Sequence, residues 1–456
     1  MQQGYLPHPS SYRDPSGFLF YREGTLYRQV NKPFGNEFEK LIKGGLYDHL
    51  SGKGDLISHE AISANLTGRE DWYATLKPSP LPFISYPYEW SFGMLRDAAL
   101  LTLSLARQSM EYGMMLKDAS AYNVQFHNGR MVFIDSLSFE TYKPEQPWIA
   151  YRQFCEHFFA PLALMHYLQL PLQELLLAWP DGIPLNVTGK LLPTRSKFNL
   201  NSFLHLHLHG SVARRQKDKA QPKQSFSPAK LKNLLRSLEE AIDAFELKAK
   251  GVWSDYYDEA GQRAGYLEAK QAIVSRWLQH TAPGSVIDIG ANEGAFSLLA
   301  SGIGARVIST DMDHYSVDRL YKKIRSEGQK NIHPLVMDLA KPSPAIGANN
   351  RERQAFSERA NADMVLALAL VHHLAVGRNL PFADIARFCK SLGRMLVIEF
   401  IPRSDEKLTL MLQQRQDDCE WYNRENFLAG FSDLYRVVAE EAVGTTGRIL
   451  FLMQPF

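Results

Sequence analysis

Apolar and polar positions in the first quarter of the chain follow two patterns. Apolar runs between turns rich in Gly, Pro and Asp predict short β-hairpins over residues 14–31. Residues 36–50 have the apolar period of a helix, which ends at the glycine pair 44–45 or resumes beyond it. Ser91 can cap a long amphipathic helix that continues to about Tyr112. This mixture of strands and helices predicts an α+β domain.

From Ser285 onward, short apolar runs alternate with amphipathic stretches of helical period. Such alternation predicts a parallel sheet covered by helices, which is an α/β architecture. A Gly-Thr-Thr-Gly turn at 444–447 joins the last two runs as a hairpin, so the final strand is expected to be antiparallel. The seven expected strands are residues 286–289, 306–311, 333–338, 363–370, 395–400, 435–439 and 448–453.

The middle of the chain carries other patterns. Residues 148–179 are strongly apolar and helical, and His157 and His166 within them are expected to be core residues. Residues 205–209 alternate His with Leu, which in a strand places three imidazoles on one face, toward a metal or toward solvent or a partner. Residues 211–228 are basic and poor in apolar side chains, which is typical of a linker, with a nucleic-acid contact as the alternative.

Length and composition set the number of domains. The 456 residues exceed one typical domain, and 45% hydrophobic with 22% charged residues is ordinary for a soluble globular protein. The expected division is an N-terminal α+β accessory domain at 1–210, a basic linker at 211–228, a helical connector at 229–280 and a Rossmann-like α/β domain at 281–456.

Net charge, cysteine spacing and the lack of long apolar runs limit the expected partners and cellular location of the protein. The net charge of +2 is close to neutral, so the overall balance does not indicate a nucleic-acid partner. Cys155, Cys389 and Cys419 have no zinc or disulfide spacing, which predicts buried thiols in a reducing compartment. We find neither a signal peptide nor an apolar run long enough to span a bilayer, so we expect a cytoplasmic protein without a transmembrane segment.

A candidate ligand site begins where the first strand of the α/β domain ends. Asp288 closes the apolar run, and the turn Gly290-x-Asn292-x-Gly294 leads into a helix. Glycines suit a sharp turn that approaches a ligand closely, and the helix start presents free N–H groups. The stretch therefore predicts a nucleotide-like cofactor.

The next two strands also end in acids. Asp311 can accept both hydroxyl protons of a ribose, and Asp338 can bond an adenine amino group. With these acids, Asp363 and the closing hairpin, residues 250–456 resemble the class I S-adenosylmethionine (SAM)-dependent methyltransferases. A dinucleotide-binding Rossmann enzyme is the nearest rival, but it would need Gly-x-Gly-x-x-Gly, and the antiparallel hairpin speaks against it.

The resemblance implies a seven-stranded class I methyltransferase domain with SAM as cofactor. Tyr256 or Tyr257 closes over the cofactor from the N-terminal side or, alternatively, packs in the core. The implied contacts are Asp288, Gly290 and Gly294 at the methionine part, Asn292 in the turn, Asp311 at the ribose, and Asp338 with Leu339 at the adenine.

A longer resemblance covers nearly the whole chain. Residues 27–31, 83–92, 116–123 and 398–405 are similar to a bacterial family of nodulation-protein-NoeA-like methyltransferases. That family implies a SAM-binding C-terminal half behind an N-terminal half of unassigned role. The methyl acceptor stays open among a sugar, RNA, a protein and a small metabolite.

In methyl transfer the protein chiefly aligns the nucleophile with the methyl group, because the SAM sulfonium is already a good leaving-group centre. A base helps when the nucleophile is a hydroxyl or a protonated amine. His372, His373 and Glu399 are the candidates, since they follow strands four and five on the same rim of the sheet. One histidine is expected to be structural, and a metal site built from all three is the alternative.

A second candidate site lies in the N-terminal domain. Asn-Gly at 128–129 predicts a hairpin, with Asp118 and Asn123 before its first strand and Asp135 after its second. This resembles the catalytic loop and metal-binding acid of protein-kinase-like phosphotransferases. The resemblance implies a nucleotide, Asp118 as base, and Asn123 and Asp135 as ligands of Mg²⁺.

Several positions depart from the kinase pattern. Leu116 stands where protein kinases carry His, no Gly-rich loop precedes it, and Arg28 is a loose candidate for the strand lysine. A capped hairpin without ligand, a kinase-like fold without activity and an active phosphotransferase therefore stay open.

Three functions follow for the whole chain. The main one is a SAM-dependent methyltransferase whose N-terminal domain selects the acceptor substrate or a partner. The others are a non-catalytic SAM-binding scaffold and a bifunctional protein with phosphotransfer in its N-terminal domain.

Overall fold

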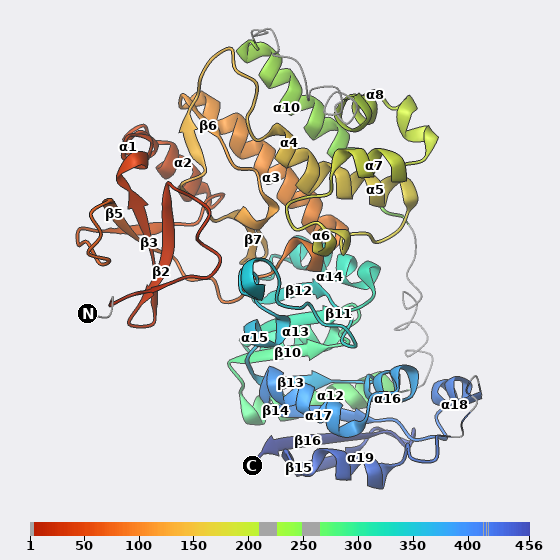
Figure 1. Ribbon diagram of the computed structural model, residues 1–456. Helices are drawn as coiled ribbons and strands as arrows, with labels where there is room; N and C mark the ends of the chain where they lie inside the picture. Colours follow the sequence, from red (N-terminus) through yellow and green to blue (C-terminus); the bar gives the residue numbers. More distant parts are fainter. Residues whose placement is uncertain (1–3, 209–225, 249–264, 414, 416, 418) are drawn as a thin grey trace. The chain divides into compact units, whose positions relative to one another are not determined.

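The computed structural model describes residues 4–208, 226–248, 265–413, 415, 417 and 419–456 (Figure 1). The chain divides into two compact units. The first unit holds Met1–Ala249 together with Ile346–Arg353, and the second holds Lys250–Ala345 and Gln354–Phe456. The four-part division expected from the sequence is finer than this one and stays a prediction.

The first unit contains a five-stranded antiparallel sheet in the order β1-β2-β3-β5-β4. Gly45, with a φ of 83°, separates two helices, α1 (Gly35–Lys43) and α2 (Leu46–Lys53), so the predicted helix ends at the glycine pair and then resumes. The strands are β1 (Leu6–Pro7), β2 (Gly17–Arg22), β3 (Thr25–Asn31), β4 (His59–Ile62) and β5 (Trp72–Pro78). Val30, Phe34, Phe38, Leu76 and Leu137 form a buried apolar cluster.

The predicted long helix of the first unit is α3 (Phe92–Glu111), and the Ser91 hydroxyl accepts the Met94 N–H at its start. The predicted hairpin is also present, as β7 (Val124–His127) paired with β8 (Arg130–Phe133). The remaining elements are β6 (Met114–Leu116), β9 (Phe139–Thr141), α4 (Tyr151–Phe154), α5 (Ala160–Leu168), α6 (Leu175–Ala178), α7 (Leu185–Leu191), α8 (Leu200–Ser202) and α10 (Pro228–Asp243), with a π-helix at Cys155–Phe159.

The predicted histidine strand is wrong, because Phe203–Leu208 is a π-helix. His205 is buried there, within hydrogen-bond distance of the Tyr151 hydroxyl (2.8 Å) and of Ser237 Oγ (3.1 Å). The partners of His205 come from segments distant in sequence, which the alternation of His and Leu does not reveal. His209 and most of the basic stretch at 211–228 lie outside the described residues.

The second unit is built on a seven-stranded sheet in the order β12-β11-β10-β13-β14-β16-β15. The first five strands of this order are parallel, and β16 runs antiparallel to both β14 and β15. The bounds are β10 (Ser285–Ile289), β11 (Arg306–Asp311), β12 (Ile332–Val336), β13 (Ala362–Ala367), β14 (Gly393–Phe400), β15 (Tyr435–Ala442) and β16 (Ile449–Pro455). The predicted class I methyltransferase architecture, with its antiparallel closing strand, is confirmed.

Helices cover both faces of this sheet. The chain proceeds from β10 to β11 and β12 in one direction and to β13 and β14 in the other. Because parallel crossovers are right-handed, the reversal places the helices of the two halves on opposite faces. The helices are α12 (Tyr266–Thr281), α13 (Ala295–Gly302), α14 (His314–Glu327), α15 (Phe356–Arg359), α16 (Val371–Arg378), α17 (Phe382–Leu392), α18 (Glu406–Gln413) and α19 (Arg424–Phe431).

Two simpler expectations concern cysteines and membranes. Cys155, Cys389 and Cys419 are free and buried, as predicted. Within the described part of the chain, no helix combines the length and the apolar character needed to cross a bilayer.

Candidate functional site

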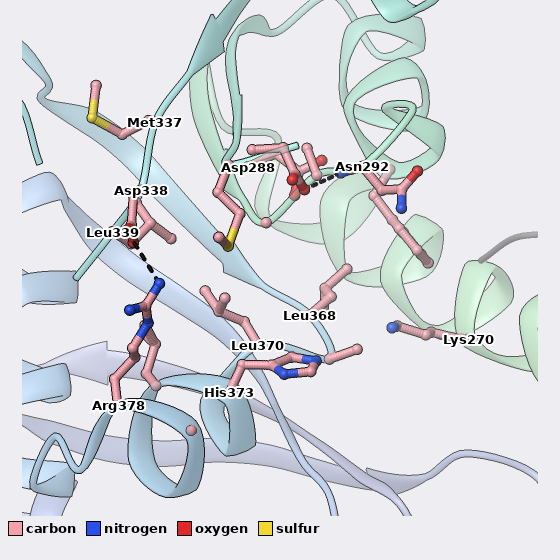
Figure 2. Close-up of a pocket in the computed structure, with 18 of the residues that line it drawn as sticks. Lys270, Asp288, Asn292, Met337, Asp338, Leu339, Leu368, Leu370, His373 and Arg378 are labelled. Carbon is pink, nitrogen blue, oxygen red and sulfur yellow. Dashed lines mark hydrogen bonds and ion pairs between the residues drawn. The ribbon is translucent and has the colours of Figure 1, made fainter. Parts of the chain in front are cut away.

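The second unit carries a cavity at the carboxyl ends of β10, β11, β12 and β13 (Figure 2). The strand order reverses between β10 and β13, and open α/β sheets bind ligands in the crevice at such a reversal. The N-terminal part of α12, the turn after β10, Phe296 of α13 and the helix α16 also line the cavity. The fold therefore places the cavity where the sequence predicts the cofactor.

The predicted glycine turn forms one wall of the cavity. Gly290 and Asn292 line it with left-handed backbone, at φ values of 75° and 51°. Gly294 also has a positive φ of 78°, but it does not line the cavity. A Cβ there would come within 2.7 Å of the Leu320 side chain, so Gly294 allows α13 to pack closely on α14. The sequence pattern does not distinguish these two uses of glycine.

Asp288 and Asp311 are the buried acids of the cavity. The Ser297 hydroxyl donates to Asp288 (2.7 Å), and the Asn292 N–H (2.7 Å) and Asp313 N–H (2.8 Å) donate to different oxygens of Asp311. Burial raises the pKa of each carboxyl to about 6, and these hydrogen bonds oppose the rise. Both carboxyl groups therefore change charge around pH 6.

The end of β12 supplies the edge of the cavity expected to hold a base. Asp338 accepts the Ala340 N–H (3.0 Å) and pairs with Arg378 of α16 (3.3 Å), while Leu339 and Met337 line the cavity beside it (Figure 2). An aspartate between two apolar side chains suits a flat aromatic ring that carries an amino group.

The two adjacent histidines have different environments. His373 lines the cavity and is half-buried, whereas His372 is 2% exposed and lies outside the lining. Burial, with smaller contributions from Lys407 and Arg448, lowers the pKa of His373 to about 4, so its imidazole is neutral at pH 7. Of the two histidines, His373 is the one whose side chain lines the cavity.

Glu399 lies behind the cavity in a closed network of buried groups. It pairs with Lys270 (2.6 Å) and accepts from the Tyr266 hydroxyl (2.8 Å) and the Ala369 N–H (2.8 Å). Arg448 lies 3.7 Å from it. Burial alone would raise the pKa of Glu399, but Lys270 and Arg448 outweigh it and hold the pKa below its ordinary range. Two of its partners, Lys270 and Tyr266, lie on α12, so Glu399 ties this helix to β14.

Sequence reasoning missed several lining residues. Tyr266 and Lys270 stand four residues apart on α12 and face the cavity together. Their helical spacing, just before the first strand, is the signal from which they could be found. Met312, Leu368 and Leu370 follow strand ends and have no comparable signal. Tyr256 and Tyr257 lie outside the described residues.

The first unit brings Asn123 and Asp135 together at one end of the hairpin. The Ser138 hydroxyl donates to Asp135 (2.5 Å) and accepts from the Asn123 amide (3.3 Å). Arg28 of β3 pairs with Asp135 and, against the effect of burial, holds its pKa below the ordinary value. That Arg28 takes the place of the strand lysine of protein kinases stays a prediction.

Asp118 lies beside Asn123 in the same region of the first unit, and the Asn123 side chain is hydrogen-bonded to it. Asp118 also accepts the Ser120 N–H (2.9 Å) and the Gln153 amide (2.8 Å). Burial raises its pKa, and the negative charge of Asp135 adds to the rise. Among the described residues of the whole chain, no three His, Cys, Asp or Glu side chains are grouped as a metal site would require.

Comparison with solved structures yields only distant similarity. A magnesium protoporphyrin IX methyltransferase from Synechocystis PCC 6803 with bound SAH is 17% identical, covers 42% of this chain and 85% of its own, and has a TM-score of 0.32. The N-methyltransferase NodS from Bradyrhizobium japonicum WM9 is 12% identical over 42% of this chain and 97% of its own, with a TM-score of 0.32. The bifunctional kinase-methyltransferase WbdD is 16% identical over 43% of this chain and 42% of its own, with a TM-score of 0.28. At these scores, the fold assignment rests on the strand order alone.

Comparison with sequences gives a firmer result. No protein-family model matches the chain. Nodulation protein NoeA of Rhizobium meliloti (strain 1021), however, is 32% identical over 463 residues, and the alignment covers 97% of this chain and 95% of the relative. The chain therefore belongs to the family of nodulation protein NoeA.

Proposed function

We propose that this protein is a SAM-dependent methyltransferase. The observation that carries the proposal is the order of groups along the cavity. Lys270 and Asp288 stand at the β10 side, Asp311 at the end of β11, and Asp338 at the end of β12. The same order suits the amino-acid, ribose and adenine parts of SAM.

The cavity lining fits the cofactor part by part. The oxygens of Asp311 accept the N–H groups of Asn292, Asp313 and Met312, and a carboxylate has about four lone-pair sites, which leaves capacity for a ribose hydroxyl. Asp338 and Leu339 suit the adenine. Lys270 and Asp288 carry the opposite charges that a methionine carboxylate and amine require. SAM supplies an electrophilic methyl group, and the residues of this chain bind it, orient it and exclude water.

We further propose His373 as the group that accepts a proton from a hydroxyl or ammonium nucleophile. The imidazole of His373 lines the cavity and is neutral at pH 7, so a ring nitrogen can accept a proton, although its pKa of about 4 makes it a weak base. Glu399 is less suited to this role, because Lys270, Tyr266 and a backbone N–H already use its oxygens. We therefore assign Glu399 to positioning Lys270.

Calorimetry with SAM tests the cofactor assignment. Asp311→Ala is expected to weaken SAM binding by about 10- to 100-fold, which corresponds to the loss of hydrogen bonds to a charged acceptor. Glu327→Gln, at the exposed end of α14, is the matched control and should bind as the wild type does. A wild-type chain without SAM affinity would exclude the proposal.

Transfer of labelled methyl groups separates an enzyme from a scaffold. Wild-type protein incubated with labelled SAM and with sugar, RNA, protein or small-metabolite fractions of a cell extract should label one fraction. His373→Ala is expected to lower that labelling by about 100-fold or more and to leave SAM affinity within about twofold. SAM binding without labelling of any fraction would favour the scaffold.

A nucleotide and Mg²⁺ site in the first unit is the second candidate. The pair of Arg28, from a central strand, with Asp135 favours it. Both oxygens of Asp135 are already engaged by Arg28, by the Leu137 N–H and by Ser138, so a metal would have to displace one of these partners. We therefore derive no phosphotransfer step.

Asn123 is the better residue at which to test this candidate, because it is the other implied ligand of Mg²⁺. Removing Asp135 would leave the partly buried Arg28 guanidinium without its carboxylate partner, and the loss of stability would obscure binding. Calorimetry with Mg-ATP should show binding by the wild type and by the exposed control Glu111→Gln, and loss in Asn123→Ala. No heat with the wild type would eliminate the site.

A further inference from the structure

The connection between β12 and β13 is shared between the two units. Its first and last parts belong to the second unit, but Ile346–Arg353 belongs to the first. We call these eight residues the clasp. Ile346 and Arg353 exchange two backbone hydrogen bonds of 3.0 Å, so the chain enters and leaves the first unit at one point.

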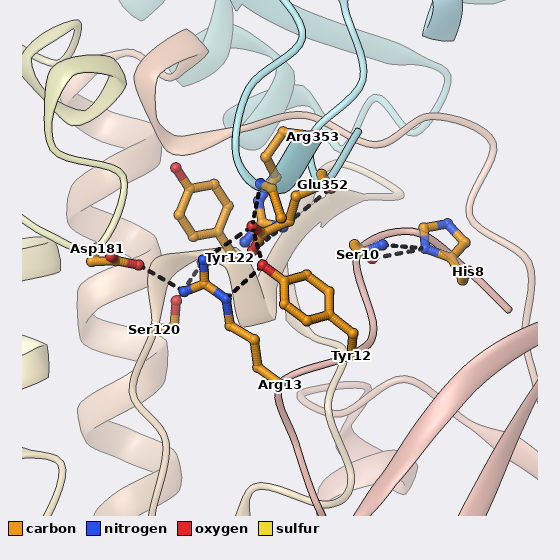
Figure 3. A network of polar contacts seen from close by, with 10 residues as sticks. His8, Ser10, Tyr12, Arg13, Ser120, Tyr122, Asp181, Glu352 and Arg353 are labelled. Atoms are coloured by element: carbon orange, nitrogen blue, oxygen red, sulfur yellow. Dashed lines mark hydrogen bonds and ion pairs between the residues drawn. The ribbon is translucent and has the colours of Figure 1, made fainter. Parts of the chain in front are cut away.

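Glu352 is the anchor of the clasp within the first unit. It is 7% exposed, and one of its oxygens accepts from the Tyr12 hydroxyl (2.9 Å), the Arg13 guanidinium (3.1 Å) and the Ala348 N–H (3.2 Å) (Figure 3). Arg13 also pairs with Asp181 (3.1 Å). A buried carboxylate with this many donors holds its segment firmly, because releasing it would leave several polar groups without partners.

Arg353 provides a second attachment. Its guanidinium lies 4.1 Å from the centre of the Tyr122 ring and pairs with Glu352 (3.1 Å). Tyr122 belongs to the loop that runs from Asp118 to Asn123. The clasp thus packs on the candidate site of the first unit, as Figure 3 shows for Tyr122 and Arg353.

The same connection begins at the edge of the SAM cavity. Met337 lines the cavity, and its sulfur accepts the Ser343 N–H (3.3 Å). The Ser343 carbonyl accepts the N–H of the fully buried Phe356 (2.9 Å). Ser343 stands three residues before Ile346. A short, internally bonded piece of chain therefore joins the base-binding edge of the cavity to the clasp.

We infer that Glu352 and Arg353 are positioning residues for the adenine end of the SAM cavity, acting through Met337 and Asp338. A loop anchored at both ends has fewer conformations to lose when a ligand binds, which raises affinity by pre-organisation. This inference rests on the proposed function. It assigns part of the SAM affinity to side chains of the first unit, including Arg13.

The experiment compares two arginines of the clasp in the full-length protein. Arg353→Ala is expected to weaken SAM binding by about 3- to 10-fold in calorimetry, as couplings through packed segments usually do. Arg351→Ala, two residues away and exposed, is the matched control and should bind SAM as the wild type does. 5′-Methylthioadenosine, which lacks the amino-acid part, should lose the same factor as SAM with Arg353→Ala.

Hydrogen exchange measured without ligand provides a readout that a general loss of stability would not produce. Arg353→Ala should speed amide exchange at residues 337–345 and leave exchange at β10 unchanged. Arg13→Ala, a variant of the first unit, should reproduce both effects, and Glu352→Gln should do so in part.

Failure of the inference about the clasp can be distinguished from failure of the proposed function. A wild type that binds SAM, with Arg353→Ala and Arg13→Ala binding as tightly as Arg351→Ala, would overturn the inference. A wild type that binds neither SAM nor 5′-methylthioadenosine would overturn the proposed function instead, and faster exchange at 337–345 in Arg353→Ala would then still support the mechanical role of the clasp.

Discussion

At the scale of single residues, Lys270 is the most informative side chain of the second unit. It is 3% exposed, pairs with Glu399, lies 5.1 Å from the Phe296 ring and still lines the cavity. A lysine is rarely buried without a partner for its charge, and here Glu399 is that partner. Lys270 therefore brings a fixed positive charge to the part of the cavity that we assign to the methionine carboxylate.

Lys270→Met is expected to weaken SAM binding by about 10-fold or more, because a charge-assisted pair with the methionine carboxylate is lost. 5′-Methylthioadenosine lacks that carboxylate and should lose less than about threefold. Competition calorimetry with the two ligands measures the difference. Equal losses for both would show that Lys270 acts only through the stability of α12.

SAM affinity is expected to rise with pH between 5 and 7. The folded pKa of Asp311 is about 6, above its ordinary value of 3.8, so the carboxylate that accepts ribose hydroxyls predominates only above pH 6. If the ionised form binds, affinity at pH 5 is about 10-fold below its plateau. Asp311→Asn should remove the contribution of Asp311 to this pH dependence. The contribution of Asp288, whose pKa is also about 6, should stay.

The raised pKa values of Asp311 and Asp288 also determine how folding stability depends on pH. A raised folded pKa means that the native state holds its proton more tightly than the unfolded chain. The stabilisation from Asp311 and Asp288 is therefore complete below about pH 4 and is lost as pH rises through about 6. SAM affinity unchanged from pH 5 to 7 would contradict the assigned role of Asp311.

At the scale of elements, the turn after β10 decides how the cavity is built. Two of its glycines serve different ends, since Gly290 lines the cavity while Gly294 lets α13 approach α14. The strand ends and the turn were predictable, because both depend on local backbone conformation. The separate uses of the two glycines were not, because they depend on Leu320 and Leu370, which approach from other elements.

Gly294→Ala is expected to destabilise the second unit by about 1–3 kcal/mol, because φ is 78° and the new Cβ would meet Leu320 at 2.7 Å. Gly302→Ala, at the end of the same helix with no atom within 4 Å of the added Cβ, is the control. It should be neutral or slightly stabilising. Urea denaturation of both variants measures the difference, and equal midpoints would refute the packing role of Gly294.

At the scale of the whole molecule, the chain is two units joined by more than its linear order. The clasp belongs to the first unit although both of its flanks belong to the second. Such an exchange requires the first unit to assemble with a segment that follows it by about a hundred residues. If the inference about Arg353 and Glu352 holds, variants of the clasp change SAM binding by the second unit.

Calorimetric unfolding is expected to show two transitions, one for each unit, because units with separate cores usually unfold separately. SAM at about 100 times its dissociation constant should stabilise the second unit by about 2.7 kcal/mol. Gly294→Ala should lower the same transition. A single transition that SAM shifts as a whole would instead show that the clasp makes the two units fold cooperatively.

The seven strands, the glycine turn and the acids at successive strand ends are predictable from the order of amino acids, because strand pattern and turn chemistry are local. The packed structure was needed to find that His373 and not His372 lines the cavity, that Glu399 pairs with Lys270, and that Arg28 pairs with Asp135. Arg28 and Asp135 lie 107 residues apart in sequence. Pairing over that distance depends on how whole elements pack, which no local pattern encodes.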